Sequence, residues 1–346
     1  MQTRPAAGLA ASMPCVVLGQ FPTPLDAAPR LSAALGGPTL WIKREDLSGL
    51  ALGGNKTRQL EALMGATLAE GADTVVTTAA AQSNFCRTVA AAAAKLGLNA
   101  VLLLRGDPTT PVTGNLLLDQ LFGAEIEFVD TTDPYDPAVL RRLDAILDRL
   151  RAAGRVPKLL HVVGAAGALG AASYVPTAEE LARQFVDAGI DPVALYVTAG
   201  SGLTVAGLAL GLKHLRSGTR VVGVCAQTEA AVLHPLIVRR ANEASALLGL
   251  GTTIVEGDIE LDDQHIGTGY GVASAAGIEA MELAARKEGL VLDPVYTGKC
   301  MAGLIAHVRA GRWRAGETVI FLHSGGAPRL FAYGAEGLAA ARGVVR

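Results

Sequence analysis

The chain has 346 residues, of which 50% are hydrophobic, 18% are charged and only 4% are aromatic, and its net charge at pH 7 is −2. This length leaves room for two lobes with separate cores, and the composition excludes a disordered chain. Because aromatics are few and no run of five or more basic residues occurs, we expect neither a nucleic-acid partner nor an anionic membrane surface as a partner.

Helix and strand patterns alternate through the first half of the chain. Apolar residues from Leu60 to Leu68 have helical spacing that stops at Gly71, and residues 73–78 then predict a strand. The other elements expected in this half are helices over about 84–97, 115–122 and 137–153 and strands over 100–104, 126–129 and 159–163.

The alternation continues through the second half. It predicts helices over 177–188, after Gly202 and over 271–288, and strands over 194–198, 220–225, 290–292 and 318–322. Strands that alternate with helices of this length indicate an α/β fold of parallel sheets covered by helices on both faces. Residues 164–170, rich in Gly and Ala, fit either a crossing between two lobes or a tight helix–strand turn.

Several kinds of site and location are not expected. The four cysteines have no zinc-site spacing and predict reduced thiols, and no two of the six histidines lie three to five residues apart, so we expect no metal. The apolar stretch 77–94 contains Gln82, Asn84 and Arg87, which disfavour a membrane span. Without a signal-peptide pattern, we expect a cytoplasmic protein.

A glycine-rich segment follows the predicted strand 194–198 and opens a helix. Its small residues would let backbone N–H groups approach an anion at the positive helix end, with hydroxyls from two side chains beside them. The segment consists of Ala199, Gly200, Ser201, Gly202, Leu203 and Thr204. It lacks the spacing and the lysine of a nucleoside-triphosphate loop, so it predicts a cup for one phosphate; a purely structural turn is the alternative.

Two further polar segments lie where sites are expected in α/β sheets, after apolar runs. Residues Gln82, Ser83 and Asn84 follow the strand over 73–78, and an ordinary helix cap would explain them equally well. Lys56 follows Gly53 and Gly54 in the first turn of a helix, where the helix dipole disfavours a cation and favours a neutral, nucleophilic amine. The alternative is an exposed lysine after a glycine turn.

Together these segments resemble the fold-type II pyridoxal-phosphate enzymes, in the branch of the D-cysteine desulfhydrase and 1-aminocyclopropane-1-carboxylate deaminase family. The resemblance covers nearly the whole chain, and its separate motifs occur in the family's order. They are residues 21–24 (FPTP), 43–46 (KRED), 53–58 (GGNKTR), 82–84 (QSN), 114–118 (GNLLL), 269–271 (GYG), 293–296 (DPVY) and 324–326 (SGG).

The resemblance implies the architecture of the tryptophan synthase β-subunit, with two lobes of twisted parallel sheets and the cofactor between them. Residues 1–57 and 169–346 would form the large cofactor-binding domain, and residues 58–168 would form the small one. The family also implies a homodimer and a small amino-acid substrate.

Roles follow for the matched residues. Lys56 would hold pyridoxal 5′-phosphate as a Schiff base and carry the proton. Ser83, with Gln82 and Asn84 beside it, would bind the substrate, and Asn84 would also hydrogen-bond the phenolic oxygen of the cofactor. The residues that would contact the phosphate or the ring are Ala199, Gly200, Ser201, Gly202, Leu203, Thr204, Tyr296, Thr297 and Ser324. Tyr270 would face the substrate; an ordinary core position for Tyr296 and a turn position for Tyr270 are the alternatives.

Two positions indicate which branch of this family the chain resembles more. The deaminase carries a glutamate and a leucine where this chain has Thr297 and Ser324. A carboxylate near the pyridine nitrogen would make the ring a stronger electron sink, which opening a cyclopropane needs more than expelling a good leaving group does. We therefore expect α,β-elimination, with D-cysteine yielding pyruvate, hydrogen sulfide and ammonia.

Other activities stay open at this point. L-cysteate, which would lose sulfite, is the second candidate, followed by the cyclopropane acid and by a binding protein without catalysis. Phe85 stands where relatives have a histidine or another polar residue, and Arg329 follows the second glycine pair. Because of these two differences, the identity of the leaving group stays open. Arg329 is either a surface residue near a helix start or a partner for an anionic β-substituent. The chirality of the substrate cannot be predicted from the sequence.

Overall fold

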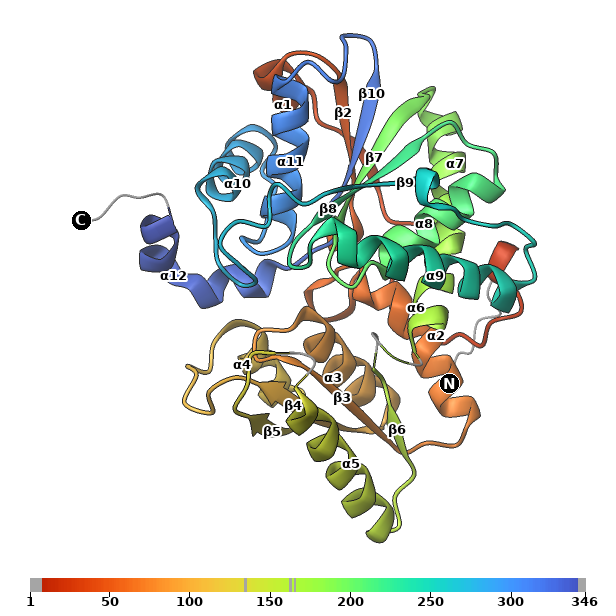
Figure 1. The fold of residues 1–346 in the computed structure, drawn as a ribbon, viewed down its shortest axis with the longest axis vertical. Helices are drawn as coiled ribbons and strands as arrows, with labels where there is room; N and C mark the ends of the chain where they lie inside the picture. The colour runs from red at the N-terminus through yellow and green to blue at the C-terminus, as the bar shows by residue number, and fades with distance from the viewer. Residues whose placement is uncertain (1–7, 134–135, 162–163, 165, 342–346) are drawn as a thin grey trace.

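The computed structural model describes residues 8–133, 136–161, 164 and 166–341, and these residues form two separate sheets (Figure 1). The smaller sheet uses only the segment between residues 74 and 159, whereas the larger one combines strands from both ends of the chain. The α/β class with two helix-covered sheets is therefore confirmed.

The larger sheet has six strands in the order β1-β2-β10-β7-β8-β9. Their bounds are Leu25–Ala27, Thr39–Lys43, Thr318–Leu322, Pro192–Ala199, Arg220–Cys225 and Ile259–Asp262. All neighbours pair in parallel except β1, a three-residue edge strand that runs antiparallel to β2. The central strands are continuous runs of buried apolar residues, as expected when helices cover both faces.

The smaller sheet has four parallel strands in the order β5-β4-β3-β6. Their bounds are Glu125–Val129, Asn99–Arg105, Thr74–Ala80 and Pro157–Leu159. Helix α5 (Pro137–Ala152) packs its apolar side chains on one face of β3 and β4, and α3 (Asn84–Leu96) packs on the other.

Helices on both sides of the larger sheet form two cores. One core contains α7 and α8, and the other contains α1, α10 and α11 (Figure 1). The remaining helix bounds are α1 Pro29–Leu35, α2 Lys56–Ala69, α4 Gly114–Leu121, α6 Gly167–Ala172, α7 Val175–Ala188, α8 Leu203–His214, α9 Ala230–Leu248, α10 Ala275–Glu288, α11 Thr297–Arg309 and α12 Ala327–Ala341. Short 3-10 turns span Gly8–Ala10, Glu45–Leu47, Leu50–Leu52 and Glu256–Asp258.

Two predicted strands need correction. Residues 290–292 form no strand; Leu290 and Leu292, on either side of an exposed Val291, are instead buried in the core with side chains of α10 and α11. The strand predicted over 159–163 is β6, which ends at Leu159; residues 162–163 of that prediction lie outside the described residues.

Other features agree with the sequence-based expectations or leave them untested. The boundaries at residues 57/58 and 168/169 stay a prediction, and α2 and α6, which contact each other, lie beside them. None of the described helices is long and apolar enough to cross a membrane. All four cysteines are free thiols, as predicted.

Candidate active site

A cavity of about 200 Å³ lies at the carboxyl ends of strands from both sheets. It brings together most of the residues that the sequence singled out. These are Lys56, Ser83, Asn84, Gly200, Ser201, Gly202, Leu203, Thr204, Tyr270, Tyr296 and Ser324. Residues from six separate segments therefore meet in one small volume.

The turn that presents Lys56 requires glycine on both sides. Gly54 has φ +118°, and a Cβ there would lie 3.1 Å from the Ser324 carbonyl oxygen. Gly325 has φ +91°, and a Cβ there would lie 2.7 Å from the Gly54 Cα. The two glycine turns thus pack directly against each other, and the Asn55 N–H donates to the Ser324 carbonyl at 3.0 Å. Larger residues would force Lys56 away from β10.

A buried ion pair fixes the same turn from the other side. The Arg58 guanidinium donates to both carboxylate oxygens of Glu45, at 2.7 and 2.8 Å. The Tyr174 hydroxyl contacts Glu45 Oε2 at 2.9 Å and the Asn55 carbonyl at 3.1 Å. The KRED and GGNKTR motifs are therefore structurally one unit, which anchors the first turn of α2 and with it Lys56.

The Lys56 amine is unpaired. No hydrogen bond or ion pair joins its Nζ to another described residue, and the half-buried side chain opens into the cavity. Desolvation lowers the pKa of Lys56 to about 8. Lys56 is also the first residue of α2, so the sequence-based expectation of a lysine in a first helical turn is confirmed. An amine in this setting is partly neutral near pH 8 and can act as a nucleophile.

The glycine-rich segment forms a cup at the start of α8. Gly202 has φ +80°, and a Cβ there would lie 2.4 Å from Ile237. The N-cap residue, Gly202, has no side chain to cap the helix, so the first N–H groups of α8 are available to a ligand. The Thr204 hydroxyl accepts a hydrogen bond from the Asn55 amide at 3.0 Å, which leaves its own proton to donate. The cup is suited to an anion such as a phosphate.

Ser83 and Asn84 present polar groups from the opposite lobe. Ser83 caps α3, because its Oγ accepts from the N–H groups of Phe85 and Cys86 at 3.1 and 3.2 Å. The helix-cap interpretation is thus confirmed, and the hydroxyl proton stays available to the cavity. Asn84 Oδ1 accepts from Asn115 Nδ2 at 2.8 Å, so the N–H groups of the Asn84 amide are the part of this side chain left to donate to a ligand.

Two tyrosines meet across the cavity. The hydroxyls of Tyr270 and Tyr296 are 2.7 Å apart, and their rings are T-shaped with centroids 6.1 Å apart. Burial raises the pKa of Tyr296 well above its usual value, with Tyr270 as the next cause, so Tyr296 is a neutral phenol. Tyr270 lies in a turn, as one interpretation had it, and it also lines the cavity.

Arg329 lies behind Tyr270 and is not a surface residue. It is 4% exposed, and its Nη1 donates to the Tyr270 hydroxyl at 3.0 Å and to the Gln82 carbonyl at 3.1 Å. Its guanidinium also lies 4.9 Å from the Tyr270 ring centroid. The arginine therefore contacts the tyrosine pair rather than the cavity itself.

Three predicted residues do not line the cavity. The Gln82 side chain is held by Thr113 and by the Asn115 N–H, each at 2.9 Å. Thr297 donates to Asp293 Oδ1 at 2.8 Å, and the same carboxylate accepts from the backbone of the turn that presents Tyr296. Ala199 is fully buried at the end of β7. These residues support the site from behind, and their direct contacts with ligands stay a prediction.

The cavity also contains residues that the sequence interpretation missed. They are Thr78, Ala79, Ala80, Arg105, His161, Thr198, Gln227, Thr228, Leu233 and Leu236. Phe85 and Asn55, both noted in the sequence above, also line the cavity. Arg105 ends β4, and Gln227 follows β8 by two residues. The rule that polar residues after apolar runs mark the site would have found both. Nothing in the sequence marks His161, which follows the short edge strand β6.

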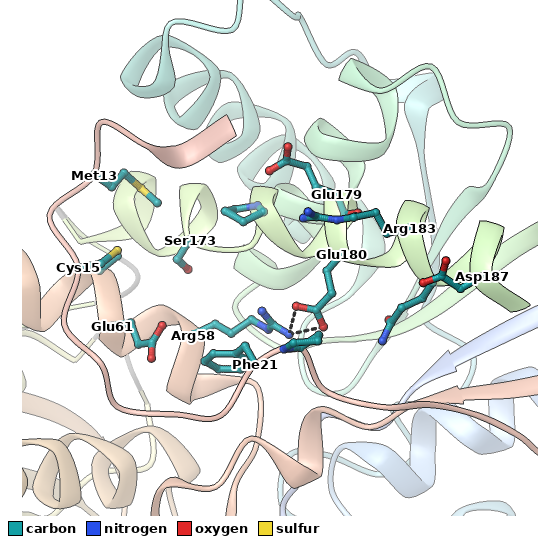
Figure 2. Close-up of a pocket in the computed structure, with 14 residues that line it drawn as sticks. Met13, Cys15, Phe21, Arg58, Glu61, Ser173, Glu179, Glu180, Arg183 and Asp187 are labelled. Atoms are coloured by element: carbon teal, nitrogen blue, oxygen red, sulfur yellow. Dashed lines mark hydrogen bonds and ion pairs between the residues drawn. The ribbon is translucent and has the colours of Figure 1, made fainter. Parts of the chain in front are cut away.

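A larger hollow, of about 430 Å³, lies elsewhere, between α2, α7 and the segment before β1 (Figure 2). Figure 2 shows Arg58 extending across the hollow to Glu180. The central carbon of its guanidinium lies 4.0 Å from the centroid of the Phe21 ring. None of the predicted site residues lines this hollow. We place the site in the smaller cavity, because only there do an unpaired amine, an anion cup and two phenols meet.

These features fit pyridoxal phosphate. The cofactor needs an unpaired lysine amine, a phosphate cup and a donor for its phenolic oxygen, and the cavity offers Lys56, the cup of residues 200–204 and the Asn84 amide. A Cβ on Gly200 would lie 3.5 Å from the Tyr296 ring, so the cup and this ring bound the same space. Each requirement is met by a group whose functional atom is left open toward the cavity.

Comparisons with known proteins agree with a site for pyridoxal phosphate. The profile of the family described as pyridoxal-phosphate-dependent enzymes matches residues 16–325. D-cysteine desulfhydrases from Salmonella choleraesuis (strain SC-B67) and Salmonella typhimurium (strain LT2) are 43% identical over 319 residues, which cover 90% of this chain and 94% of each relative. A solved structure of an ACC deaminase homologue has a TM-score of 0.86 and 36% identity, and it covers 96% of this chain and 97% of the other. The resemblance indicated by the motifs is confirmed.

Proposed function

Because the chain belongs to the pyridoxal-phosphate-dependent enzyme family, we propose that it is a carbon–sulfur lyase that converts D-cysteine and water to pyruvate, hydrogen sulfide and ammonia. Its cofactor is pyridoxal 5′-phosphate. The observation that carries the proposal is the unpaired Lys56 amine, which shares one cavity with an anion cup and two facing phenols. The similarity to D-cysteine desulfhydrases supports the choice of substrate.

Some residues of this chain hold the cofactor and the substrate, and others transfer protons. Bound pyridoxal phosphate supplies an aldehyde that captures amines and a conjugated ring that accepts the electron pair released at Cα. Lys56 Nζ would hold the cofactor, and as a free amine it would be the base that moves the Cα proton. The Ser83 hydroxyl donates to the substrate carboxylate, since its lone pairs already accept from the start of α3.

The tyrosine pair has one phenolic proton to spare. Arg329 can only donate, so its bond to Tyr270 occupies an acceptor position on that oxygen. The contact between Tyr270 and Tyr296 uses one of the two phenolic protons, and the other is free to point into the cavity. We infer that this proton goes to the leaving sulfur, so that hydrogen sulfide departs in place of a poorer anionic leaving group.

The surroundings of the site favour sulfide over the alternatives. A sulfonate, as in L-cysteate, would need a cation; the Arg329 guanidinium is directed at Tyr270 and is not free for it, and Arg105 at the end of β4 is the arginine that lines the cavity. Thr297, where the deaminase carries a glutamate, has its hydroxyl on Asp293 and leaves no carboxylate at that position. Phe85 adds an apolar surface that suits a thiol.

A substrate panel tests the proposal. The cofactor-loaded protein is assayed for pyruvate with D-cysteine, L-cysteine, L-cysteate and 1-aminocyclopropane-1-carboxylate (the last through its keto-acid product). We expect the highest kcat/KM with D-cysteine and equal amounts of sulfide and pyruvate. A preference for L-cysteate with release of sulfite would replace the proposal by its second candidate, and no turnover of any substrate would leave only cofactor binding.

We also propose a cytoplasmic homodimer with lobes divided at residues 57/58 and 168/169. The four free thiols support a reducing compartment. Exposed apolar side chains on α4 and α12, of which Leu121 and Phe331 are more than 70% exposed, support a partner surface. Sedimentation equilibrium would give the mass of the assembly, and a monomer at micromolar concentration would contradict the dimer.

A further inference from the structure

Lys299 is a buried cation outside the set of residues discussed so far. It lies in the first turn of α11, three residues after Tyr296, and is 0% exposed. Its ammonium donates to three backbone carbonyls, those of Ala226 at 3.3 Å, Ile266 at 2.6 Å and Gly269 at 3.0 Å. All three N–H donors of the ammonium are therefore used.

The absence of an anion makes this arrangement unusual among the described lysines. The other fully buried lysine, Lys43, pairs with the Glu180 carboxylate, as buried charges generally do. No ion pair within the described ranges involves Lys299, whose partners are neutral carbonyl oxygens. Burial, followed by the charge of Arg329, lowers the pKa of Lys299 to about 8, while Asp293 opposes the shift.

The three carbonyls belong to two of the segments that bring polar side chains to the cavity. Ala226 directly precedes Gln227 and Thr228, which line the cavity. Ile266 and Gly269 belong to residues 263–274, the segment between β9 and α10, and Gly269 directly precedes Tyr270. One ammonium thus joins both segments to the helix that begins beside Tyr296.

The segment 263–274 is held at its two ends, where the Gln264 N–H donates to Asp262 Oδ1 and the Ser274 carbonyl accepts from the Ile278 N–H, each at 2.9 Å, but has few backbone hydrogen bonds between them. It contains no helix or strand, and its internal backbone bonds, from Ile266 to Asp263 and from Val272 to Gly269, are both 3.4 Å long. The Tyr333 hydroxyl holds the Gly271 carbonyl on the far side of Tyr270. Lys299 on one side and Tyr333 on the other therefore bracket Tyr270.

We propose that the Lys299 ammonium is a built-in cation that holds residues 263–274 where the Tyr270 hydroxyl meets that of Tyr296, which makes Lys299 a positioning residue for proton transfer. The kinetic part of this inference rests on the proposed lyase function. Lys299 does not touch the cavity. Its loss would misalign Tyr270 and lower kcat, while the phosphate cup at α8 and hence cofactor binding would be unaffected.

The site can be tested by removing the side chain and supplying a free cation. In Lys299→Ala the three carbonyls remain, and ammonium or potassium at about 0.1 M should occupy the space. We expect kcat on D-cysteine to fall by at least about tenfold and ammonium to restore most of it, because one well-placed charged hydrogen bond is worth a factor of this size. Tetramethylammonium, which cannot donate hydrogen bonds, should restore nothing.

Matched variants separate positioning from general stability. Lys299→Met keeps the apolar stem and removes the charge, so it should lose kcat without rescue by ammonium, and it provides a folded variant if the alanine variant is unstable. Lys213→Ala removes a lysine that is 39% exposed and pairs with Asp258 at the surface, and it should leave kcat unchanged. In a Tyr270→Phe background, Lys299→Met should lower kcat by less than about threefold, because the Tyr270 hydroxyl that Lys299 positions is already absent.

Hydrogen exchange decides the inference without any substrate. We expect amides of residues 263–274 to exchange at least about tenfold faster in Lys299→Ala than in the parent, and ammonium to restore their protection. Unchanged exchange in this segment, no response to ammonium, or equal losses of kcat from Lys299→Met in the parent and Tyr270→Phe backgrounds would overturn the role of Lys299. Because exchange is measured without turnover, this result stands even if D-cysteine is not the substrate.

Discussion

The Asn55 amide donates a hydrogen bond of 3.0 Å to the Thr204 hydroxyl, although the two residues are 149 positions apart in the chain. Asn55 directly precedes Lys56, and Thr204 lies in the first turn of α8, above the glycine cup. The bond therefore joins the turn that carries Lys56, the proposed cofactor lysine, to the proposed phosphate cup.

Thr204→Val should weaken cofactor binding. Valine keeps the shape of threonine but removes the hydroxyl that accepts from Asn55 and that would donate to the phosphate. One hydrogen bond to a charged group is worth about 1.5–3 kcal/mol, so the Kd for pyridoxal phosphate should rise roughly ten- to a hundredfold. Titration of the cofactor-free protein measures this Kd. The matched control is Thr67→Val, since the Thr67 hydroxyl bonds only the Leu63 carbonyl within α2; equal effects of both changes would contradict a phosphate contact.

The reactivity of Lys56 should depend on pH with a midpoint of about 8, the pKa to which desolvation lowers its amine. Only the neutral amine is nucleophilic, so in cofactor-free protein the rate of modification at Lys56 should rise with pH up to about 8 and then level off. A free ε-amine has a pKa of about 10.4, and its rate keeps rising over that range. Mass spectrometry of the Lys56 peptide after timed labelling gives the profile. A midpoint near 10.4 would show that the amine is solvated.

Arg329→Ala should lower kcat/KM by a similar factor for every substrate. The guanidinium contacts the Tyr270 hydroxyl and not the cavity, so it acts on the tyrosine pair that all eliminations share. We expect a loss of roughly ten- to a hundredfold in kcat/KM, as for one charged hydrogen bond. Comparing D-cysteine with L-cysteate measures the selectivity. A much larger loss on L-cysteate would mean that Arg329 binds an anionic β-substituent after all.

Glu45→Gln should destabilise the fold at neutral pH. Glu45 is fully buried between Arg58, Tyr174 and Thr23, and removing its charge leaves the Arg58 cation partly unpaired, at a cost of about 3–5 kcal/mol. Although burial acts to raise it, the pKa of Glu45 is lowered to about 2, chiefly by Arg58. The stabilisation is therefore complete above the unfolded-state value of 4.5 and is lost as pH falls toward 2.

Urea unfolding of the cofactor-free protein checks both statements. The difference in unfolding free energy between parent and Glu45→Gln should be large at pH 7 and shrink below pH 4.5. Glu256→Gln is the matched control, because that carboxylate is 89% exposed and should contribute little. A constant difference across the acid range would contradict a charged Glu45.

Local patterns marked most of the residues that line the cavity, whereas several elements of the fold left no pattern. Gly53 and Gly54 before Lys56, and the glycine cup before α8, were found because a positive φ or a close backbone approach leaves few residue types possible. Helix α9 was missed, and Pro235 inside it breaks the helical pattern. Strand β1 is too short to show a period.

Contacts between distant segments could not be predicted from any pattern. Gln82 was expected to face the substrate, but Thr113 and Asn115 take up its amide in the structure. Arg329 left two interpretations open, because only the packing of α12 against the tyrosine turn decides where its guanidinium points. Lys299 carries no sequence signal at all, since its partners are backbone carbonyls of two other segments.

The most direct test of the central claim is the comparison of parent and Lys56→Ala proteins, each loaded with pyridoxal phosphate and mixed with D-cysteine. The account predicts a yellow parent protein that releases pyruvate and sulfide in equal amounts. It predicts that Lys56→Ala loses both the yellow absorbance of the lysine-bound cofactor and the lyase activity. A Lys56→Ala protein that forms pyruvate from D-cysteine at the parent rate would contradict it.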